Sequence, residues 1–280
     1  MKNKIALFLL LSFISTGLFA QIKTPAPSPT ASVSQNVGLT KVTVEYSRPS
    51  VKGRLIFGDL TPYGKVWRTG ANKITTIKFD HDVLIEGQKI AAGSYGWYSI
   101  PGKEEWIIAL NSDDKQWGAY AYDQSKDVRR ITIKPYQVPM TEVLTIALEQ
   151  TSPNSLNVIL SWETTAVKFK VEHDPHDQIL AEIKEKTAKA DCTADTYFDA
   201  ADYYYEKGLD LKQALAWADK VVEKDKQYWT YQLRARILAK LGDCPRAVAD
   251  AKISLEMAQK EGDDSYVKKN EAILKQCEGK

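Results

Sequence analysis

The chain has 280 residues, of which 44% are hydrophobic and 26% are charged. Its 38 basic and 36 acidic residues give a formal net charge of +2. Nucleic-acid binders and general anionic-membrane binders need a larger excess of Lys and Arg, so we expect no nucleic-acid partner and no general binding to anionic membranes. A single domain usually has about 100 to 150 residues, so the length predicts two domains.

Residues 1–20 have the pattern of a secretory signal peptide. Lys2 and Lys4 precede an apolar run from Ile5 to Phe19, which ends at the small residue Ala20. The run is interrupted by Ser, Thr and Gly, and a membrane-spanning helix needs about 20 apolar residues. We therefore expect an exported protein, periplasmic or extracellular, with no membrane span after signal cleavage. Cleavage also removes two lysines and leaves 36 basic and 36 acidic residues.

Residues 21–30 form a Pro-rich leader, whose small polar residues and prolines do not suit a packed element. From Lys41 to Val171 the hydrophobic residues then alternate with polar ones, as in half-buried strands. Examples are Val42, Val44 and Tyr46; Ile77 and Phe79; Leu156, Val158 and Leu160; and Val167, Phe169 and Val171. About nine short strands without an intervening helical pattern predict an antiparallel β-sandwich over residues 31–172, with a barrel as the alternative.

The period changes to 3.6 residues beyond His173, so residues 173–192 are interpreted as a linker with a short helix, and residues 193–280 as a helical domain. Five helices are expected there, over residues 193–207, 211–224, 228–240, 245–260 and 265–277. Gly208 and Gly242 are 34 residues apart, which is the period of the tetratricopeptide repeat. The second unit resembles that repeat at Tyr231, Ala235, Leu238, Gly242, Ala247 and Ala251. Such repeats are expected to engage a protein or peptide partner.

All three cysteines lie in the helical region, and we expect a disulfide between Cys244 and Cys277, with Cys192 free. The last two helices should pack antiparallel across the turn near Gly262. Cys244 lies 18 residues before that glycine and Cys277 lies 15 after it, which is an axial mismatch of only about 5 Å. Export supplies an oxidising environment. Three buried free thiols are the alternative.

The stretch from Arg48 to Lys73 holds six basic residues, three aromatic residues and the single acid Asp59. Together with Ala92–Tyr95, Ile100–Lys103 and Gln116–Tyr120, it resembles the protein family of unknown function numbered 2911, over about residues 30 to 172. That family occurs in exported proteins of certain Gram-negative bacteria, so the resemblance implies a periplasmic or extracellular location. It implies no activity, cofactor or catalytic residue.

Two interpretations of this basic segment remain open. As a loop that binds an anion or a sugar, it would use planar Arg forks for carboxylate or phosphate and aromatic faces for stacking. The candidates are Arg48, Lys52, Arg54, Asp59, Tyr63, Trp67, Arg68 and Asn72. In the structural interpretation, which we favour, Asp59 pairs with one Arg and Trp67 fills the sandwich core.

Other polar clusters are weaker candidates. His173, Asp174, His176 and Asp177 have metal-ligand side chains, but we expect a solvated linker and no metal site. His81 and Asp82 are adjacent in an extended segment, so their side chains should point to opposite faces. The common catalytic and phosphate-binding motifs do not occur, and no cofactor is expected.

We therefore favour a binding or scaffold module of the envelope, in which the repeats engage a protein and the sandwich binds an anionic or glycan ligand. The alternative is a hydrolase that acts on a glycan or a phosphorylated envelope substrate through Asp59 and the surrounding arginines. A pocket in which Asp59 meets a second carboxylate or a histidine would favour the hydrolase.

Overall fold

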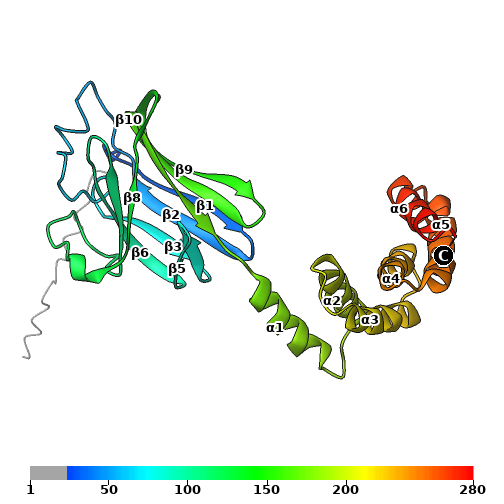
Figure 1. Ribbon diagram of the computed structural model, residues 1–280. Coiled ribbons are helices and arrows are strands. Elements are labelled where there is room, and N and C mark those ends of the chain that lie inside the picture. The colour runs from blue at the N-terminus through cyan, green and yellow to red at the C-terminus, as the bar shows by residue number, and fades with distance from the viewer. Residues whose placement is uncertain (1–23, 280) are drawn as a thin grey trace, which may run out of the picture. The chain divides into compact units, whose positions relative to one another are not determined.

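The computed structural model describes residues 24–279, so the predicted signal peptide lies outside the described residues. The chain forms two compact units, one that ends at Asp174 and one that begins at Pro175 (Figure 1). The first contains two antiparallel sheets and the second contains helices, which confirms the expected order of β then α.

From residue 24 onward, the described part of the first unit has ten strands in two sheets (Figure 1). The larger sheet has the order β1-β2-β3-β6-β7-β8, with bounds Thr30–Val37, Thr40–Ser47, Thr75–Phe79, Gly93–Ile100, Trp106–Asn111 and Asp127–Ile133. The smaller sheet has the order β5-β4-β10-β9, with bounds Gln88–Ile90, Val83–Ile85, Ser155–Glu172 and Tyr136–Ser152. A short 3-10 helix, Gln124–Lys126, precedes β8.

The alternation read from the sequence places the core between the sheets. Val42, Val44 and Tyr46 of β2 are buried, whereas Glu45 between them is exposed. The hydroxyl group of Tyr46 accepts a hydrogen bond of 3.0 Å from the backbone N–H of Ile146, so this side chain also links the two sheets. The largest fully buried side chains are Trp97, Trp106 and Trp162.

Three details of the strands differ from the prediction. The sequence pattern predicted separate strands around Leu156 and around Val167, but both belong to one strand, β10. The pairing of β10 with β9 shifts register at Glu163, which interrupts the alternation. β1 is largely polar and half exposed, so alternation did not reveal it, and its first residue, Thr30, belongs to the predicted leader. β6 is mostly buried on both faces, which hides its period of two.

In its described residues, 175–279, the second unit has six helices, α1 to α6 (Figure 1). Their bounds are His176–Thr187, Ala194–Glu206, Leu211–Lys224, Tyr228–Leu241, Cys244–Glu261 and Asp264–Gln276. Side chains cap several N-termini: Asp210 accepts hydrogen bonds from two backbone N–H groups of α3, and Asp263 does the same for α6. These caps explain why the predicted helix ends lie so close to the observed ones.

Small residues and one ion-pair network hold the helices together. Ala201, Ala214, Ala247 and Ala251 are fully buried, which allows close approach of neighbouring helices. Arg234 on α4 donates two hydrogen bonds of 2.7 and 2.8 Å to Asp250 on α5, and a third of 3.0 Å to Asp219 on α3. This guanidinium group therefore connects three successive helices.

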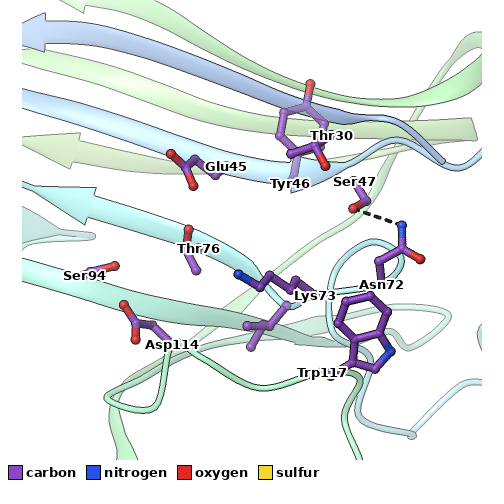
Figure 2. Close-up of a pocket in the computed structure, with 11 residues that line it drawn as sticks. Thr30, Glu45, Tyr46, Ser47, Asn72, Lys73, Thr76, Ser94, Asp114 and Trp117 are labelled. Atoms are coloured by element: carbon purple, nitrogen blue, oxygen red, sulfur yellow. Dashed lines mark hydrogen bonds between the residues drawn. The ribbon is translucent and has the colours of Figure 1, made fainter. Parts of the chain in front are cut away.

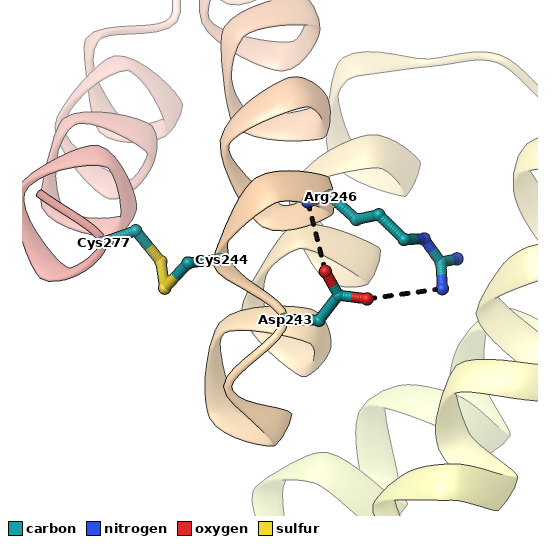
Figure 3. The surroundings of a disulfide bond; sticks show 4 residues. All are labelled: Asp243, Cys244, Arg246 and Cys277. Carbon is teal, nitrogen blue, oxygen red and sulfur yellow. Dashed lines mark hydrogen bonds and ion pairs between the residues drawn. A yellow bond between two sulfur atoms is a disulfide. The ribbon is translucent and has the colours of Figure 1, made fainter. Parts of the chain in front are cut away.

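A disulfide joins Cys244 at the start of α5 to Cys277 after α6, with the two Cα atoms 5.3 Å apart (Figure 3). Cys192 is free and buried. Beside the disulfide, the carboxylate of Asp243 accepts a hydrogen bond from the backbone N–H of Arg246 and so caps α5. Within residues 24–279, no helix has the length and apolar character needed to cross a membrane.

Candidate functional site

Two arginines of the basic segment donate hydrogen bonds to backbone carbonyls. Arg48 donates from Nε to the carbonyl of Leu144 at 3.1 Å and from Nη2 to Thr145 Oγ1 at 3.0 Å. Arg54 donates to the carbonyls of Ser50 and Val51 at 2.6 and 3.0 Å. The guanidinium groups therefore brace the segment, and each forms two hydrogen bonds within it or to β9.

Trp67 belongs to the core. Its ring stacks on Trp162 with centroids 5.8 Å apart and lies edge-on to Phe57 and Trp106. Its Nε1 donates a hydrogen bond of 3.0 Å to the carbonyl of Gly70. The indole is thus held by its neighbours, as the structural interpretation expects, and it is partly buried against the core.

The remaining candidates of the segment do not converge on one point. Lys52 and Asp59 are exposed, and among residues 24–279 Asp59 forms no ion pair, so the expected Asp–Arg pair is wrong. Tyr63 is 39% exposed, and Arg68 is half-buried. The Nε atom of Arg68 is buried and has no hydrogen-bond partner in the described part of the chain.

A pocket of about 380 Å³ lies elsewhere on the sandwich, on the larger sheet (Figure 2). Glu45 of β2, Thr76 of β3 and Ser94 of β6 form its base. Because they alternate with buried residues of the same strands, these side chains lie on the face turned away from the smaller sheet. The other lining residues are Thr30, Tyr46, Ser47, Asn72, Lys73, Ile74, Asp114 and Trp117.

The wall of the pocket is built by two segments that pair with each other. Lys73 and Trp117 form an isolated antiparallel bridge, and the N–H of Gly118 donates to the carbonyl of Asn72 at 3.2 Å. The side chain of Asn72 donates a hydrogen bond of 3.2 Å to the carbonyl of Ser28, which fixes the rim next to β1. Of the predicted ligand-binding residues, Asn72 alone lines this pocket.

An exposed aromatic ring, that of Trp117, lines the pocket, and Tyr120 follows it in the same loop. Trp117 is 66% exposed and Tyr120 is 95% exposed. The ring of Tyr120 lies over Gly118, where a Cβ atom would be only 2.7 Å from Tyr120 Cε2, and the φ of +83° at this position favours glycine. The base of the pocket carries hydroxyl groups and two carboxylates, Glu45 and Asp114, against the single ammonium of Lys73.

This combination suits a neutral polyhydroxylated ligand better than an anion. A flat indole face packs against the C–H face of a sugar ring, while carboxylates, hydroxyls and amides hydrogen-bond its hydroxyl groups. Two carboxylates in one pocket would instead repel phosphate or carboxylate groups. The sequence did not reveal the pocket, because its residues come from four strands and two loops. The one available signal was Trp117 itself, an aromatic residue in a polar hairpin.

Comparison with known families assigns the first unit. Residues 28–171, just over half of the 280-residue chain, match the family model described as a protein of unknown function, DUF2911. The chain belongs to the DUF2911 family. No curated protein and no solved structure matches it.

At the end of the DUF2911 domain, His173 corrects one prediction. It is only 5% exposed, its Nδ1 lies 2.9 Å from the carbonyl oxygen of Asp82, and its ring centroid is 5.7 Å from that of His81. Its backbone N–H donates to the carbonyl of Asn154 at 3.0 Å. The expected solvated linker at this residue is therefore wrong, because His173 packs as the last residue of the sandwich core.

The other polar clusters of the DUF2911 domain have structural partners. The carboxylate of Asp82 pairs with Lys89 at 2.9 Å and accepts a hydrogen bond from the N–H of Ala92, which lowers the pKa of Asp82. The hydrogen bond from Gln116 likewise lowers the pKa of Asp113. In residues 24–279 there is no group of three or more His, Cys, Asp or Glu side chains suited to a metal ion.

Proposed function

We propose that this chain is an exported binding protein whose sandwich binds a glycan in the pocket beside Trp117. The observation that carries the proposal is an indole that is 66% exposed at the mouth of a pocket lined with hydroxyls and carboxylates. A large apolar side chain left exposed beside convergent polar groups is typical of a ligand site. The pocket volume of about 380 Å³ suits a small ligand or the end of a longer glycan.

The placement of the basic segment supports a glycan over an anionic ligand. Arg48 and Arg54 donate to backbone carbonyls, and Trp67 is held in the core. Of the six cations in that segment, only Lys73 lines the pocket. The anionic ligand therefore has less support than the glycan.

Export is part of the proposal. It rests on the signal-like pattern of residues 1–20 and on the disulfide between Cys244 and Cys277, since such bonds persist in oxidising compartments. A periplasmic or extracellular protein would encounter the glycans of the envelope directly.

For the helical unit, we propose tetratricopeptide-like packing and a protein or peptide partner. The hairpins α2–α3 and α4–α5 follow each other at the repeat spacing, and α2, α4 and α6 together line a hollow of about 400 Å³. Its cations are Arg236, Lys240 and Lys269. Arg236 is paired with Asp202 and Glu206, whereas the two lysines form no ion pair in the described part of the chain. An acidic segment of a partner would complement them.

A hydrolase remains the second candidate, with different residues from those expected. Asp59 does not line the sandwich pocket, but Glu45 and Asp114 both do. Two carboxylates that flank a bound sugar are the groups that glycoside hydrolysis uses. If the pocket is catalytic, these two residues are its candidate acid and base or nucleophile.

Screening of soluble glycans against the full chain tests the proposal. We expect one class of glycan to bind, and Trp117→Ala to weaken the binding roughly tenfold or more. Trp229→Ala is the matched control, since Trp229 is an exposed tryptophan in the helical unit. Failure to bind any glycan, or equal binding by Trp117→Ala, would overturn the proposal. If the chain shortens the glycan during incubation and Glu45→Gln does not, the result would favour the hydrolase.

A further inference from the structure

A second exposed apolar surface lies in the basic segment and does not belong to the pocket. Leu55, Leu60 and Tyr63 are 59%, 46% and 39% exposed. We call these three side chains the apolar tip. Figure 1 shows the segment that carries them as a long blue loop that projects from one end of the sandwich.

The apolar tip is held in a defined conformation. Ile56 and Phe57, next to Leu55, are buried in the core and anchor the loop. The N–H of Leu60 donates to the carbonyl of Leu55 at 3.3 Å, so the two exposed leucines are neighbours. The loop is closed further by hydrogen bonds of 2.8 Å from Thr61 to Ile56 and 2.9 Å from Gly58 to Thr61.

Tyr63 is fixed against the same loop. A Cβ atom on Gly58 would be only 2.7 Å from Tyr63 Cε2, so the ring lies directly on this glycine, whose φ is +101°. The next residue, Gly64, donates to the carbonyl of Pro101 at 2.8 Å. The apolar tip is therefore exposed on a loop with a defined conformation, because the same loop buries Ile56 and Phe57 at its base.

Cations flank the apolar tip in the sequence. Lys52, Arg54 and Lys65 are exposed and form no ion pair within residues 24–279. Acids also lie near this loop: Asp59 within it, and Glu142, whose carboxylate accepts a hydrogen bond from the backbone N–H of Lys52. The exposed Glu104 and Glu105 follow Pro101, whose carbonyl accepts the hydrogen bond from Gly64. The half-buried Arg48 and Arg68 at the base of the loop add to the positive charge.

We propose that the apolar tip inserts into the interface of a lipid bilayer that carries anionic headgroups. Three apolar side chains offer too little surface for a stable protein interface, which buries about 800 Å² on each partner. A bilayer interface, in contrast, is bound by a few apolar side chains with cations beside them. The chain as a whole carries a formal net charge of only +2, so the proposed attraction depends on the cations of this loop.

Co-sedimentation of the full chain with vesicles tests the proposal. Binding is expected to vesicles of equal parts phosphatidylcholine and phosphatidylglycerol, and only weakly to phosphatidylcholine alone. The double variant of Leu55→Ser and Leu60→Ser should bind the anionic vesicles roughly tenfold more weakly or worse. Lys52→Ala and Lys65→Ala should each weaken binding by about fivefold.

The matched controls are Leu39→Ser and Lys41→Ala, at the opposite end of β2. Leu39 is 48% exposed and Lys41 is also exposed. Both should bind vesicles like the unchanged chain, and so should Trp117→Ala, which separates this surface from the glycan pocket. All of these side chains are exposed, so calorimetric unfolding should show that the variants fold.

Three results would overturn the proposal. The first is no sedimentation with anionic vesicles, which would leave a protein partner as the occupant of the apolar tip. The second is binding that the double leucine variant does not change, since charge alone would then account for it. The third is an equal loss in Leu39→Ser or Lys41→Ala, which would place the lipid contact elsewhere.

Discussion

Replacing Trp67 with Ala should destabilise the sandwich strongly, because this side chain joins a cluster of four aromatic rings. Its centroid lies 5.8 Å from that of Trp162, 6.1 Å from that of Phe57 and 6.5 Å from that of Trp106. The substitution also leaves the carbonyl of Gly70 without the hydrogen bond from Nε1. The variant therefore removes packing and one hydrogen bond at the same time.

The expected cost follows from these contacts. Removal of a buried tryptophan costs roughly 3 to 5 kcal/mol, and the partial exposure of Trp67 places it near 3 kcal/mol. For a unit of this size, that loss lowers Tm by roughly 6 to 12 °C. Differential scanning calorimetry of the full chain measures it, since the sandwich and the helical unit can unfold as separate transitions.

Trp117→Ala is the matched control, because it makes the same chemical change at a side chain that is 66% exposed. Its effect on unfolding should stay within about 0.5 kcal/mol. If Trp67→Ala costs less than about 1 kcal/mol, or if both variants are destabilised equally, then the assignment of Trp67 to the core is wrong.

Three further predictions concern stability. Asp250→Ala should lower the free energy of unfolding of the helical unit by about 3 kcal/mol, since it leaves the guanidinium of Arg234 partly buried with one carboxylate fewer; a loss below about 1 kcal/mol would contradict this. Reduction of the bond between Cys244 and Cys277 should cost about 4 kcal/mol, and peptide mapping without reduction should recover the two peptides linked. A linked peptide that contains the third cysteine would exclude that pairing. Burial and a carboxylate neighbour raise the pKa of Tyr122 from 10.0 to about 12. Between pH 10 and about 12 the folded state therefore keeps a proton that the unfolded state loses, so the free energy of unfolding falls as the pH rises. This fall should be less steep in Tyr122→Phe.

Helices and their ends could be predicted because their determinants are local. The N-caps Asp210 and Asp263 and the glycines that follow α4 and α5 stand at fixed positions relative to each helix. The disulfide partners could be chosen for a related reason, since a constant rise per residue converts spacing in the sequence into spacing along two antiparallel helices.

Strands could be predicted only where one face is buried and the other is exposed. β2 meets that condition, and its alternation was read correctly. β1 is half exposed along most of its length and β6 is mostly buried, so neither shows a clear period of two.

The pocket beside Trp117 could not be predicted because it depends on which strands become neighbours. Glu45, Thr76 and Ser94 meet only once β2, β3 and β6 are paired in that order. The sequence of the basic segment left a ligand-binding loop and a structural loop both open for a similar reason, because the carbonyls that receive Arg48 and Arg54 are not visible in the sequence.

Calorimetric titration of the glycan found by screening, into the full chain and into three variants, tests the central claim most directly. Trp117→Ala should weaken binding roughly tenfold or more, Trp117→Phe should restore part of the affinity because it keeps an aromatic face, and Trp229→Ala should bind normally. Unchanged affinity in Trp117→Ala, or an equal loss in Trp229→Ala, would contradict a glycan site at this pocket.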